Sequence, residues 1–308
     1  MAKQENQGTA SRFLKVSKPT NAVFNIIMLV LALMCILPML LILSISLSAE
    51  SSLTDFGYQF IPETFSLDGY TYIFTQSPAI IRALGISVFV TIAGTITGVV
   101  LNALMGYVIS RKGYKLQKFF IWFVFIPMIF NGGLVSSYFI IGNFLHLSNK
   151  IWVLILPLAV SSYNIILCKT FFKATIPDSL IESANIDGAS ELLIFFKIIL
   201  PLSKPVLATI ALFLSFAYWN DWFTSLLYIN DSSLYSLQAY LNKILGDIEF
   251  LLQNASTLGV AQQQILANMP KEAARMAIVI VAVVPIACTY PFFQRYFVSG
   301  LTIGAIKG

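Results

Sequence analysis

Six long apolar runs divide the sequence and limit what the chain can fold into. They cover approximately residues 22–48, 80–110, 117–141, 151–172, 205–229 and 275–297. A helix that crosses a bilayer needs about 20 mostly apolar residues, and every run is long enough. Hydrophobic residues make up 57% of the chain and charged residues 11%, whereas soluble domains carry about a quarter charged residues. The sequence therefore predicts an all-α integral membrane protein with six transmembrane helices.

The first run is predicted to remain in the protein rather than to be cleaved as a signal peptide. Its apolar stretch, from Val23 to Leu47, exceeds the roughly 7–15 residues of a signal-peptide core, and no small-x-small cleavage site follows directly.

Lysine and arginine are divided unevenly between the two sets of segments that flank the runs. Fourteen of the 19 basic residues belong to one set: Lys3, Arg12, Lys15, Lys18, Arg111, Lys112, Lys115, Lys118, Lys169, Lys173, Lys197, Lys204, Arg295 and Lys307. The other set holds Arg82, Lys150, Lys243, Lys271 and Arg275. Because basic residues favour the cytoplasmic side, both termini are predicted to be cytoplasmic. This topology explains the net charge of +5 without a nucleic-acid partner.

The domain organisation follows from this topology. A cytoplasmic tail at 1–21 precedes one membrane domain at 22–299, and a second cytoplasmic tail covers 300–308. Two sizeable segments, 49–79 and 230–274, are assigned to the outer side. In the second of these, Leu237, Tyr240, Leu241, Ile244 and Leu245 recur at helical spacing, which predicts a helix against the bundle.

The sequence lacks the residue patterns that are typical of catalytic, metal-binding or nucleotide-binding sites. Cys35, Cys168 and Cys288 all lie inside apolar runs, and His146 is the single histidine, so neither a disulfide framework nor a metal site is expected. The sequence contains no H-E-x-x-H, no G-x-S-x-G and no phosphate-binding G-x-x-x-x-G-K-[ST]. We expect no enzyme activity, no catalytic residues and no cofactor bound by this chain.

The cytoplasmic loop at about 176–201 combines a helix, a break and a second helix. Pro177 stops the preceding run, and Ser179 with Glu182 fits a capping box, with Asp178 as an alternative cap. A left-handed glycine at Gly188 would end this first helix.

A second amphipathic segment, from Glu191 to Leu200, leads to Pro201 and the fifth run. Two interpretations are open from the residues alone. The loop is either a well-capped hairpin that only joins two spans, or a docking element for a cytoplasmic partner.

One long gapped motif in this loop resembles a known family. Glu182-Ser183-Ala184, Gly188, Ile198 and Leu200-Pro201 are similar to the E-A-A-x3-G-x9-I-x-L-P loop of ABC importer permeases, with Ser183 as the one departure. Trp219-Asn220-Asp221-Trp222 and Tyr235-Ser236-Leu237-Gln238 resemble the sugar-importer branch, and so does the ending Tyr290–Phe297. Together these motifs resemble the subgroup that handles oligosaccharides or polysaccharide fragments, which is related to the maltose-type second permease.

The resemblance implies an ABC type I importer permease fold in the cell membrane. The expected partners are a second homologous permease, two cytoplasmic ATP-binding subunits that carry ATP and Mg, and an extracytoplasmic sugar-binding protein. The loop would couple ATPase movements to alternating access. The coupling residues implied are Ser179, Glu182, Ser183, Ala184, Asp187, Gly188, Ala189, Leu200 and Pro201.

A polar cluster in the fifth run is the candidate sugar path. A charged residue such as Asp221 costs roughly 2.5–3.5 kcal/mol at the centre of a span and usually faces a cavity. Pyranose rings present apolar faces and hydroxyl rims, which suit mixed aromatic and polar side chains. The candidates are Tyr138, Asn164, Trp219, Asn220, Asp221 and Trp222. The alternative is an interfacial aromatic belt for the tryptophans and helix–helix contacts for isolated polar residues.

A self-contained secondary transporter or channel is the competing function. Such a protein would need buried acids for ion coupling or paired broken helices. Asp221 is the one acid clearly within a predicted span, so the sequence favours a permease subunit.

Overall fold

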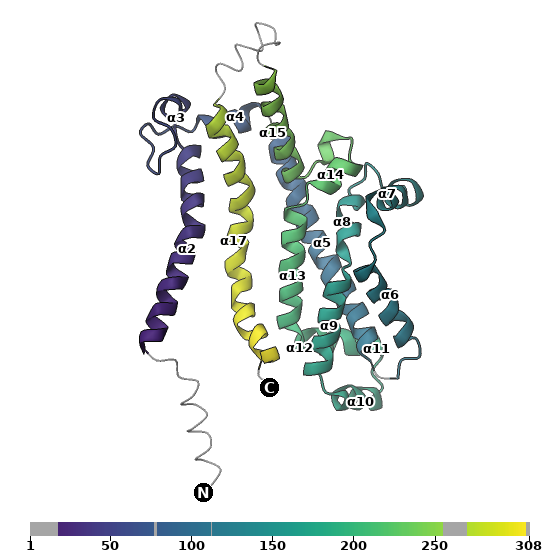
Figure 1. Cartoon of the computed structure of the whole chain (residues 1–308). Helices are drawn as coiled ribbons and strands as arrows, with labels where there is room; N and C mark the ends of the chain where they lie inside the picture. The colour runs from purple at the N-terminus through teal and green to yellow at the C-terminus, as the bar shows by residue number, and fades with distance from the viewer. Residues whose placement is uncertain (1–17, 77–78, 112, 255–269, 306–308) are drawn as a thin grey trace. The chain divides into compact units, whose positions relative to one another are not determined.

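The computed structural model describes residues 18–76, 79–111, 113–254 and 270–305 (Figure 1). Its named elements are helices, and one isolated β-bridge joins Ser48 to Phe65. The chain divides into two compact units. Unit 1 comprises Met1–Tyr72 and Asn268–Ile280, and unit 2 comprises Ile73–Ala267 and Val281–Gly308. Most residues of the two predicted tails, 1–17 and 306–308, lie outside the described residues.

Unit 1 is built on a long apolar helix, α2 (Lys18–Ser46), followed by α3 (Glu50–Phe56). It also contains the first residues of α4 (Asp68–Gln76) and of α17 (Lys271–Ala305). Ile45 of α2 and Leu53 of α3 pack against Ala273 of α17 in a small core. Gly69 of α4 lies so close to the backbone of Ala273 that a Cβ atom would overlap it. Small residues thus bring these helices together.

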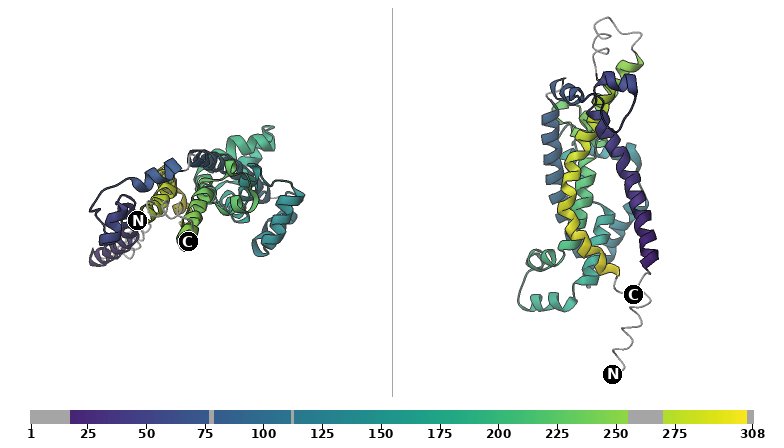
Figure 2. Two further views of the ribbon diagram at one scale, coloured as in Figure 1. Left: turned by 90° about the horizontal axis from the view of Figure 1, so that it is seen from above. Right: turned by 90° about the vertical axis from the view of Figure 1, so that its left-hand side faces the viewer.

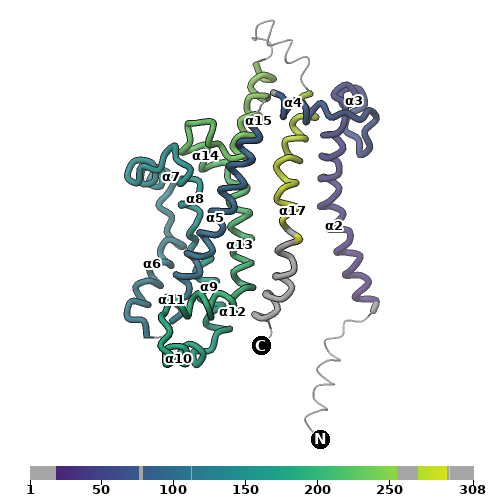
Figure 3. The backbone as a smooth tube through the Cα atoms, turned by 180° about the vertical axis from the view of Figure 1, so that it is seen from behind, coloured from purple at the N-terminus to yellow at the C-terminus, as the bar shows by residue number. Residues whose placement is uncertain are grey.

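Unit 2 is organised around α5 (Ala79–Ser110), which contacts α8 (Trp152–Ala159), α9 (Ser162–Thr175) and α13 (Lys204–Trp219) (Figures 1 and 3). Gly94, Gly98 and Gly106 share one face of α5, because their spacings of four and eight residues return to the same side of a helix. A side chain at these positions would overlap Tyr218 of α13, the carbonyl of Ala159, and Cys168 of α9. Close helix packing through small residues is typical of membrane proteins.

Asn102 occupies the same face of α5 and holds a break between two helices. Its Nδ2 donates to the carbonyl oxygens of Gly98 (2.6 Å) and Ala159 (2.8 Å), and its Oδ1 accepts from the backbone nitrogen of Ser161 (3.0 Å). The side chain is fully buried. Backbone groups that lose their helical hydrogen bonds at a break must find other partners inside a membrane protein. The Asn102 side chain is such a partner for the backbone groups at the 47° bend between α8 and α9.

Three of the six predicted runs do not form one uninterrupted helix each. The run at 151–172 breaks at this bend. The run at 117–141 forms α6 (Gln117–Ile129), α7 (Gly133–Tyr138) and η1 (Phe139–Phe144), because Gly133 has a φ of +82° and its nitrogen donates to Asn131 Oδ1. The run at 205–229 ends as α13 at Trp219. It resumes as α14 (Phe223–Tyr228) after Asp221, whose Oδ1 accepts from the nitrogen of Thr224.

Candidate membrane spans in the described part of the chain are fewer than six. Pro19–Ser46, Ala79–Ser110 and Lys271–Thr289 are each long and apolar enough to cross a bilayer. Counting each of two bent pairs as one span raises the number to five; the second pair, Glu191–Leu202 and Lys204–Trp219, bends by 84°.

The helix predicted from spacing after residue 230 is confirmed. It is α15 (Leu237–Gln253), preceded by the short η3 (Ser232–Leu234), and it buries Leu237 and Leu241. Ser236 caps α15 by accepting from the nitrogen of Ala239 (3.3 Å), and Ser87 of α5 accepts from the nitrogen of Leu237 (2.7 Å). The rest of the segment predicted to lie on the outer side, 255–269, is outside the described residues.

Candidate functional site

The segment 178–202, here called the coupling segment, lies across one end of unit 2 (Figures 1 and 2). It consists of α10 (Asp178–Ile186), α11 (Glu191–Ile194), η2 (Phe195–Ile199) and α12 (Leu200–Leu202). The predicted helix, break and second helix are therefore confirmed, and the second helix contains a π-helical turn.

The predicted capping box at the start of α10 is absent. The helix begins one residue earlier than expected, so Pro177 is its N-cap and no side chain caps it. Ser179 is the second helical residue, and its carbonyl oxygen accepts a hydrogen bond from Ser183 Oγ (2.9 Å). The proline side chain has no acceptor atom, so Pro177 cannot cap the free N–H groups of the first helical turn.

Gly188 ends α10 as predicted, with a φ of +77°. The nitrogen of Ala189 donates to the carbonyl of Ala184 (3.0 Å), and the nitrogen of Gly188 donates to that of Asn185 (3.0 Å). This pair of bonds is the Schellman motif, which requires a left-handed residue after the helix and therefore favours glycine. Asp187 is the C-cap residue.

The two faces of α10 differ in exposure. Ile181 and Ala184 are buried in the main core cluster of unit 2, together with Phe172 and Ile176. Ser179, Glu182, Ser183, Asp187 and Gly188 are exposed, and the side chain of Ile186 is 85% exposed. Ile186 is thus an exposed apolar side chain on the polar face of α10, and it was not among the predicted coupling residues.

Tyr107 of α5 joins the second half of the coupling segment to the centre of unit 2. Its hydroxyl donates to Glu191 Oε2 (2.7 Å), and its ring packs against Phe195 with 5.7 Å between ring centroids. The guanidinium carbon of Arg111 lies 5.8 Å from the centroid of the Tyr107 ring. Ser190 caps α11 by accepting from the nitrogen of Leu193 (3.3 Å). Sequence reasoning had missed both Tyr107 and Glu191, because nothing in the local pattern pairs residues 84 positions apart.

The remaining predicted coupling residues have simple placements. Ala189 is half-buried and packs against the core cluster, as does Leu200, whereas Pro201 is exposed in α12. The structure thus brings the predicted residues into one segment that has a buried face and an exposed face.

The predicted sugar-path residues have different surroundings. Trp219 is buried, and its Nε1 donates to the carbonyl of Ala282 (2.9 Å). Asn220 is exposed, and its Nδ2 donates to the carbonyl of Phe216 (2.9 Å) in its own helix. Asp221 caps α14, while Trp222 is 41% exposed. Trp219, Asn220 and Asp221 thus each make a hydrogen bond within the protein, and Trp219 alone bonds to α17.

The other two candidates lie on other elements. Tyr138 of α7 stacks on Tyr228 of α14, with ring centroids 5.5 Å apart and an interplanar angle of 16°. Asn164 is buried in α9. Trp222 lines a cavity of about 280 Å³ between α14 and α15.

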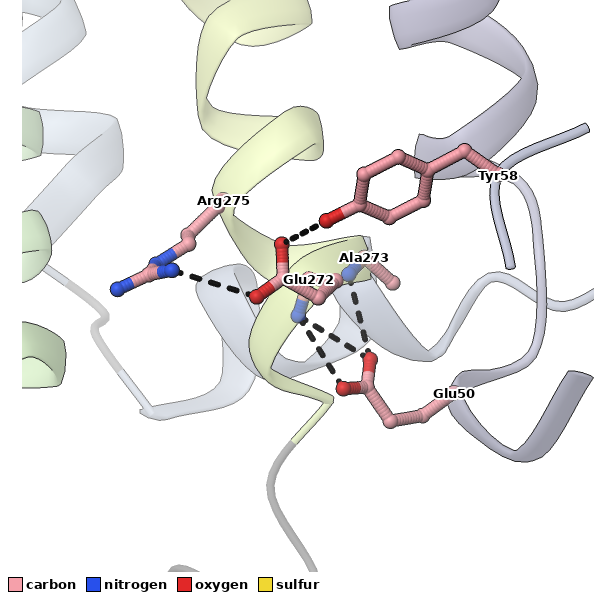
Figure 4. A network of polar contacts seen from close by, with 5 residues as sticks. All are labelled: Glu50, Tyr58, Glu272, Ala273 and Arg275. Atoms are coloured by element: carbon pink, nitrogen blue, oxygen red, sulfur yellow. Dashed lines mark hydrogen bonds and ion pairs between the residues drawn. The ribbon is translucent and has the colours of Figure 1, made fainter. Parts of the chain in front are cut away.

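A polar network ties α3 to the start of α17 within unit 1 (Figure 4). The Glu50 carboxylate accepts hydrogen bonds from the backbone nitrogens of Glu272 (3.2 Å) and Ala273 (3.3 Å). These nitrogens lie at the start of α17, where the helix dipole stabilises a negative charge. Glu272 accepts from the hydroxyl of Tyr58 (3.0 Å) and pairs with Arg275 (3.3 Å). The hydrogen bond to Glu272, with a smaller contribution from burial, raises the pKa of Tyr58. The network stabilises the contact between α3 and the start of α17 within unit 1.

Comparison with known proteins identifies the family of this chain. The family described as "Binding-protein-dependent transport system inner membrane component" matches residues 98–303, which include the whole coupling segment. The chain belongs to this family. It is a multi-pass membrane protein and the transport subunit of an ABC importer, in which ATP hydrolysis belongs to separate subunits. ATPase and substrate-binding partners are general features of such importers.

Relatives in this family cover nearly the whole chain. The polygalacturonan/rhamnogalacturonan transport system permease protein YtcP of Bacillus subtilis (strain 168) is 38% identical over 281 residues, covering 91% of this chain and 96% of its own. The arabinooligosaccharides transport system permease protein AraQ of Halalkalibacterium halodurans is 28% identical, covering 90% and 93%.

The permease fold is also present in a solved structure. A bacterial ABC transporter involved in the import of the acidic polysaccharide alginate contains a chain with a TM-score of 0.78 and 26% identity. The match covers 92% of this chain and 99% of that chain. Both the resemblance found in the sequence and the importer permease fold are confirmed.

Proposed function

We propose that this permease imports oligosaccharides as one half of a permease pair. A second homologous permease would form the other half, and two ATP-binding subunits would carry ATP and Mg, with no cofactor on this chain. The printed names of the relatives support a carbohydrate, since they refer to polygalacturonan, rhamnogalacturonan and arabinooligosaccharides. In this proposal the chain crosses the membrane six times with both termini in the cytoplasm. The membrane domain is 22–299, and the tails are 1–21 and 300–308.

The observation that carries the proposal is the two-sided coupling segment. One face of α10 is fixed to the unit 2 core through Ile181 and Ala184, and the opposite face exposes Glu182 and Ile186. A helix built in this way can bind a partner on one side and pass its movement to the membrane helices on the other. We assign the exposed face to the ATP-binding subunit, with Glu182 contacting a basic group there.

Copurification and uptake test this proposal together. The tagged chain, isolated from membranes, is expected to bring down an ATP-binding subunit and a second permease. Proteoliposomes that hold this complex and its binding protein should accumulate an oligosaccharide only when ATP is supplied inside.

Charge reversal at two exposed glutamates provides the matched comparison. Glu182→Lys should lose the ATP-binding subunit, whereas Glu249→Lys, on α15 at the opposite end of unit 2, should keep it. Retention of the subunit and normal uptake in Glu182→Lys would contradict the docking role. ATP-independent uptake by the chain alone would favour a secondary transporter.

A further inference from the structure

The helices α14 and α15 lie at the end of unit 2 opposite the coupling segment (Figure 1). Residues of these two helices and of their flanking loops line a cavity of about 280 Å³. The side chains that line it include Trp222, Tyr235, Asn242, Lys243 and Asp247, and Gly246 also borders it. Asn242 and Gly246 are four residues apart along α15, as are Lys243 and Asp247, so these two neighbouring pairs lie on one side of the helix. Ligand pockets have volumes of roughly 300–1,000 Å³, so this cavity suits one sugar residue rather than a long chain.

Lys243 is a cation available to a ligand. It forms no ion pair with any carboxylate in the described part of the chain, although Asp247 lines the same cavity one turn further along α15. Its Nζ lies 6.0 Å from the centroid of the Tyr235 ring. An aromatic ring at this distance attracts an ammonium group weakly and keeps it at the cavity wall.

The other lining groups match the parts of a sugar ring. Trp222 is 41% exposed and offers an aromatic face, and Tyr235 offers a second one. The Asn242 amide can donate to and accept from hydroxyl groups, and the Asp247 carboxylate can accept from them. At Gly246 an added Cβ would have no neighbouring atom within 4 Å, so this position leaves room in the cavity.

The combination of aromatic faces, hydroxyl partners and an unpaired ammonium group fits a particular kind of sugar. A neutral pyranose would leave Lys243 without a charged partner. A phosphate dianion would be repelled by the Asp247 carboxylate in the same cavity about twice as strongly as an anion with a single charge. A sugar that carries a single carboxylate can pair with Lys243 while its hydroxyl groups contact Asn242 and Asp247.

We propose that this cavity binds a uronate residue of the transported oligosaccharide. This inference rests on the proposed function and adds a subsite to it. The cavity follows α13, whose 16 residues span about 24 Å from the coupling segment. In the proposed orientation, the site therefore lies at the outer side, where sugar is handed over from the binding protein. Trp222 is the one predicted sugar-path residue that contributes to it.

The test uses the full importer complex in nanodiscs and proteoliposomes, with trigalacturonate and its neutral analogue galactotriose as probes. Lys243→Gln should weaken trigalacturonate binding to the nanodisc complex about tenfold, because a hydrogen bond to a charged group contributes about 1.5–3 kcal/mol and 1.4 kcal/mol is a factor of ten. Galactotriose binding should not change. Lys243→Arg should restore most of the trigalacturonate affinity, and Lys150→Gln, an exposed lysine outside the cavity, should match the unmodified protein.

Filling the cavity gives an independent measurement. Gly246→Met places a long apolar side chain into the open space and should reduce trigalacturonate binding at least tenfold, whereas Gly246→Ala should bind normally. Both substitutions should preserve folding, since glycine is a weak helix former and the position is open.

Several outcomes would overturn the inference. Equal losses for the charged and neutral probes in Lys243→Gln would assign Lys243 a structural role, and no loss in either Lys243→Gln or Gly246→Met would exclude the cavity as a binding site. If the unmodified complex imports galactotriose but neither binds nor imports trigalacturonate, the uronate site is wrong while the proposed function stands. If ATP drives the import of no oligosaccharide, the proposed function fails as well.

Discussion

The two ends of unit 2 acquire their shapes in different ways. At the coupling end, local signals fix the chain: Pro177 begins α10, Gly188 ends it, and Ser190 caps the next helix. At the opposite end, the loop between α14 and α15 depends on a residue far away in the sequence. Asn149 Oδ1 accepts from the backbone nitrogens of Asn230 (3.2 Å) and Asp231 (2.9 Å). The coupling end is therefore readable as a motif, and the opposite end is not.

This difference suits the roles that we propose for the two ends. A segment that contacts an ATPase must keep one shape while the membrane helices move, and bonds within the segment provide this. A sugar-binding end varies with the substrate, and a cavity formed by separate helices can change through single side chains without altering the fold.

Gly188→Val should have the largest effect, because it changes the residue whose left-handed conformation ends α10. A β-branched residue in a left-handed conformation costs roughly 1–2 kcal/mol and would disrupt the Schellman motif. ATP-driven uptake should fall about tenfold or more, and copurification of the ATP-binding subunit should decrease.

Gly57→Val is the matched control for Gly188→Val. Gly57 has a φ of +74° and a ψ of −162°, a region that only glycine adopts readily, and it lies in unit 1 with open space around it. Valine there imposes at least as much backbone strain, but in the other unit. Equal losses of ATPase binding in the two variants would show that general strain, and not the shape of the coupling segment, is responsible.

Asn102→Leu tests the long-range contacts on which the middle of unit 2 depends. The substitution leaves the nitrogen of Ser161 and the carbonyl of Ala159 without partners, so the free energy of unfolding should fall by about 1–3 kcal/mol. Thermal unfolding of the purified chain in detergent measures this loss.

Thr95→Val on the same helix is the control for Asn102→Leu. The Thr95 Oγ1 is buried and has no hydrogen-bond partner in the described structure, so its removal should leave stability unchanged or slightly raised. A similar loss of stability in both variants would contradict the role assigned to Asn102.

Tyr107→Phe should have a smaller effect, since it removes one hydrogen bond and keeps the ring. Glu191 is exposed and regains water, so the loss should be near 1 kcal/mol, with a several-fold decrease in uptake. The ATP-binding subunit should still copurify, because the exposed face of α10 is unchanged. Ser110→Ala is the control: it removes a hydroxyl that bonds within α5, and this variant should transport normally. Unchanged transport in Tyr107→Phe would show that the Tyr107 hydroxyl does not contribute to coupling.

Asn149→Gly should have the smallest effect and tests the opposite end. Glycine accepts the φ of +57° at this position, so the substitution removes only the two hydrogen bonds, at a cost of about 0.5 kcal/mol for exposed groups. Hydrogen exchange at the amides of Asn230 and Asp231 should accelerate. Asn149→Ala adds the strain of a left-handed alanine and should accelerate it further; equal exchange in all three proteins would show that the loop is fixed by other contacts.

The sequence alone determined the membrane class, the family and the outline of the coupling segment. These features depend on local chemistry: long apolar runs select lipid, Gly188 permits a left-handed turn, and the gapped motif lies within 20 residues. The helix α15 was also predicted, because its apolar residues recur at helical spacing. The capping box failed for a local reason, since Pro177 begins the helix one residue early and Ser179 then lies inside it.

The tertiary structure decided what depends on residues far apart in the chain. Asn102 stabilises a break between α8 and α9 that an apolar run does not reveal, and Tyr107 reaches Glu191 across 84 positions. The tryptophans of Trp219-Asn220-Asp221-Trp222 have separate roles only because α13 ends between them, which buries the first and leaves the second on the wall of a cavity. Lys243 gained significance in the same way, because the packing of α15 beside α14 places its ammonium group near the Tyr235 ring, in a cavity that Trp222 also lines.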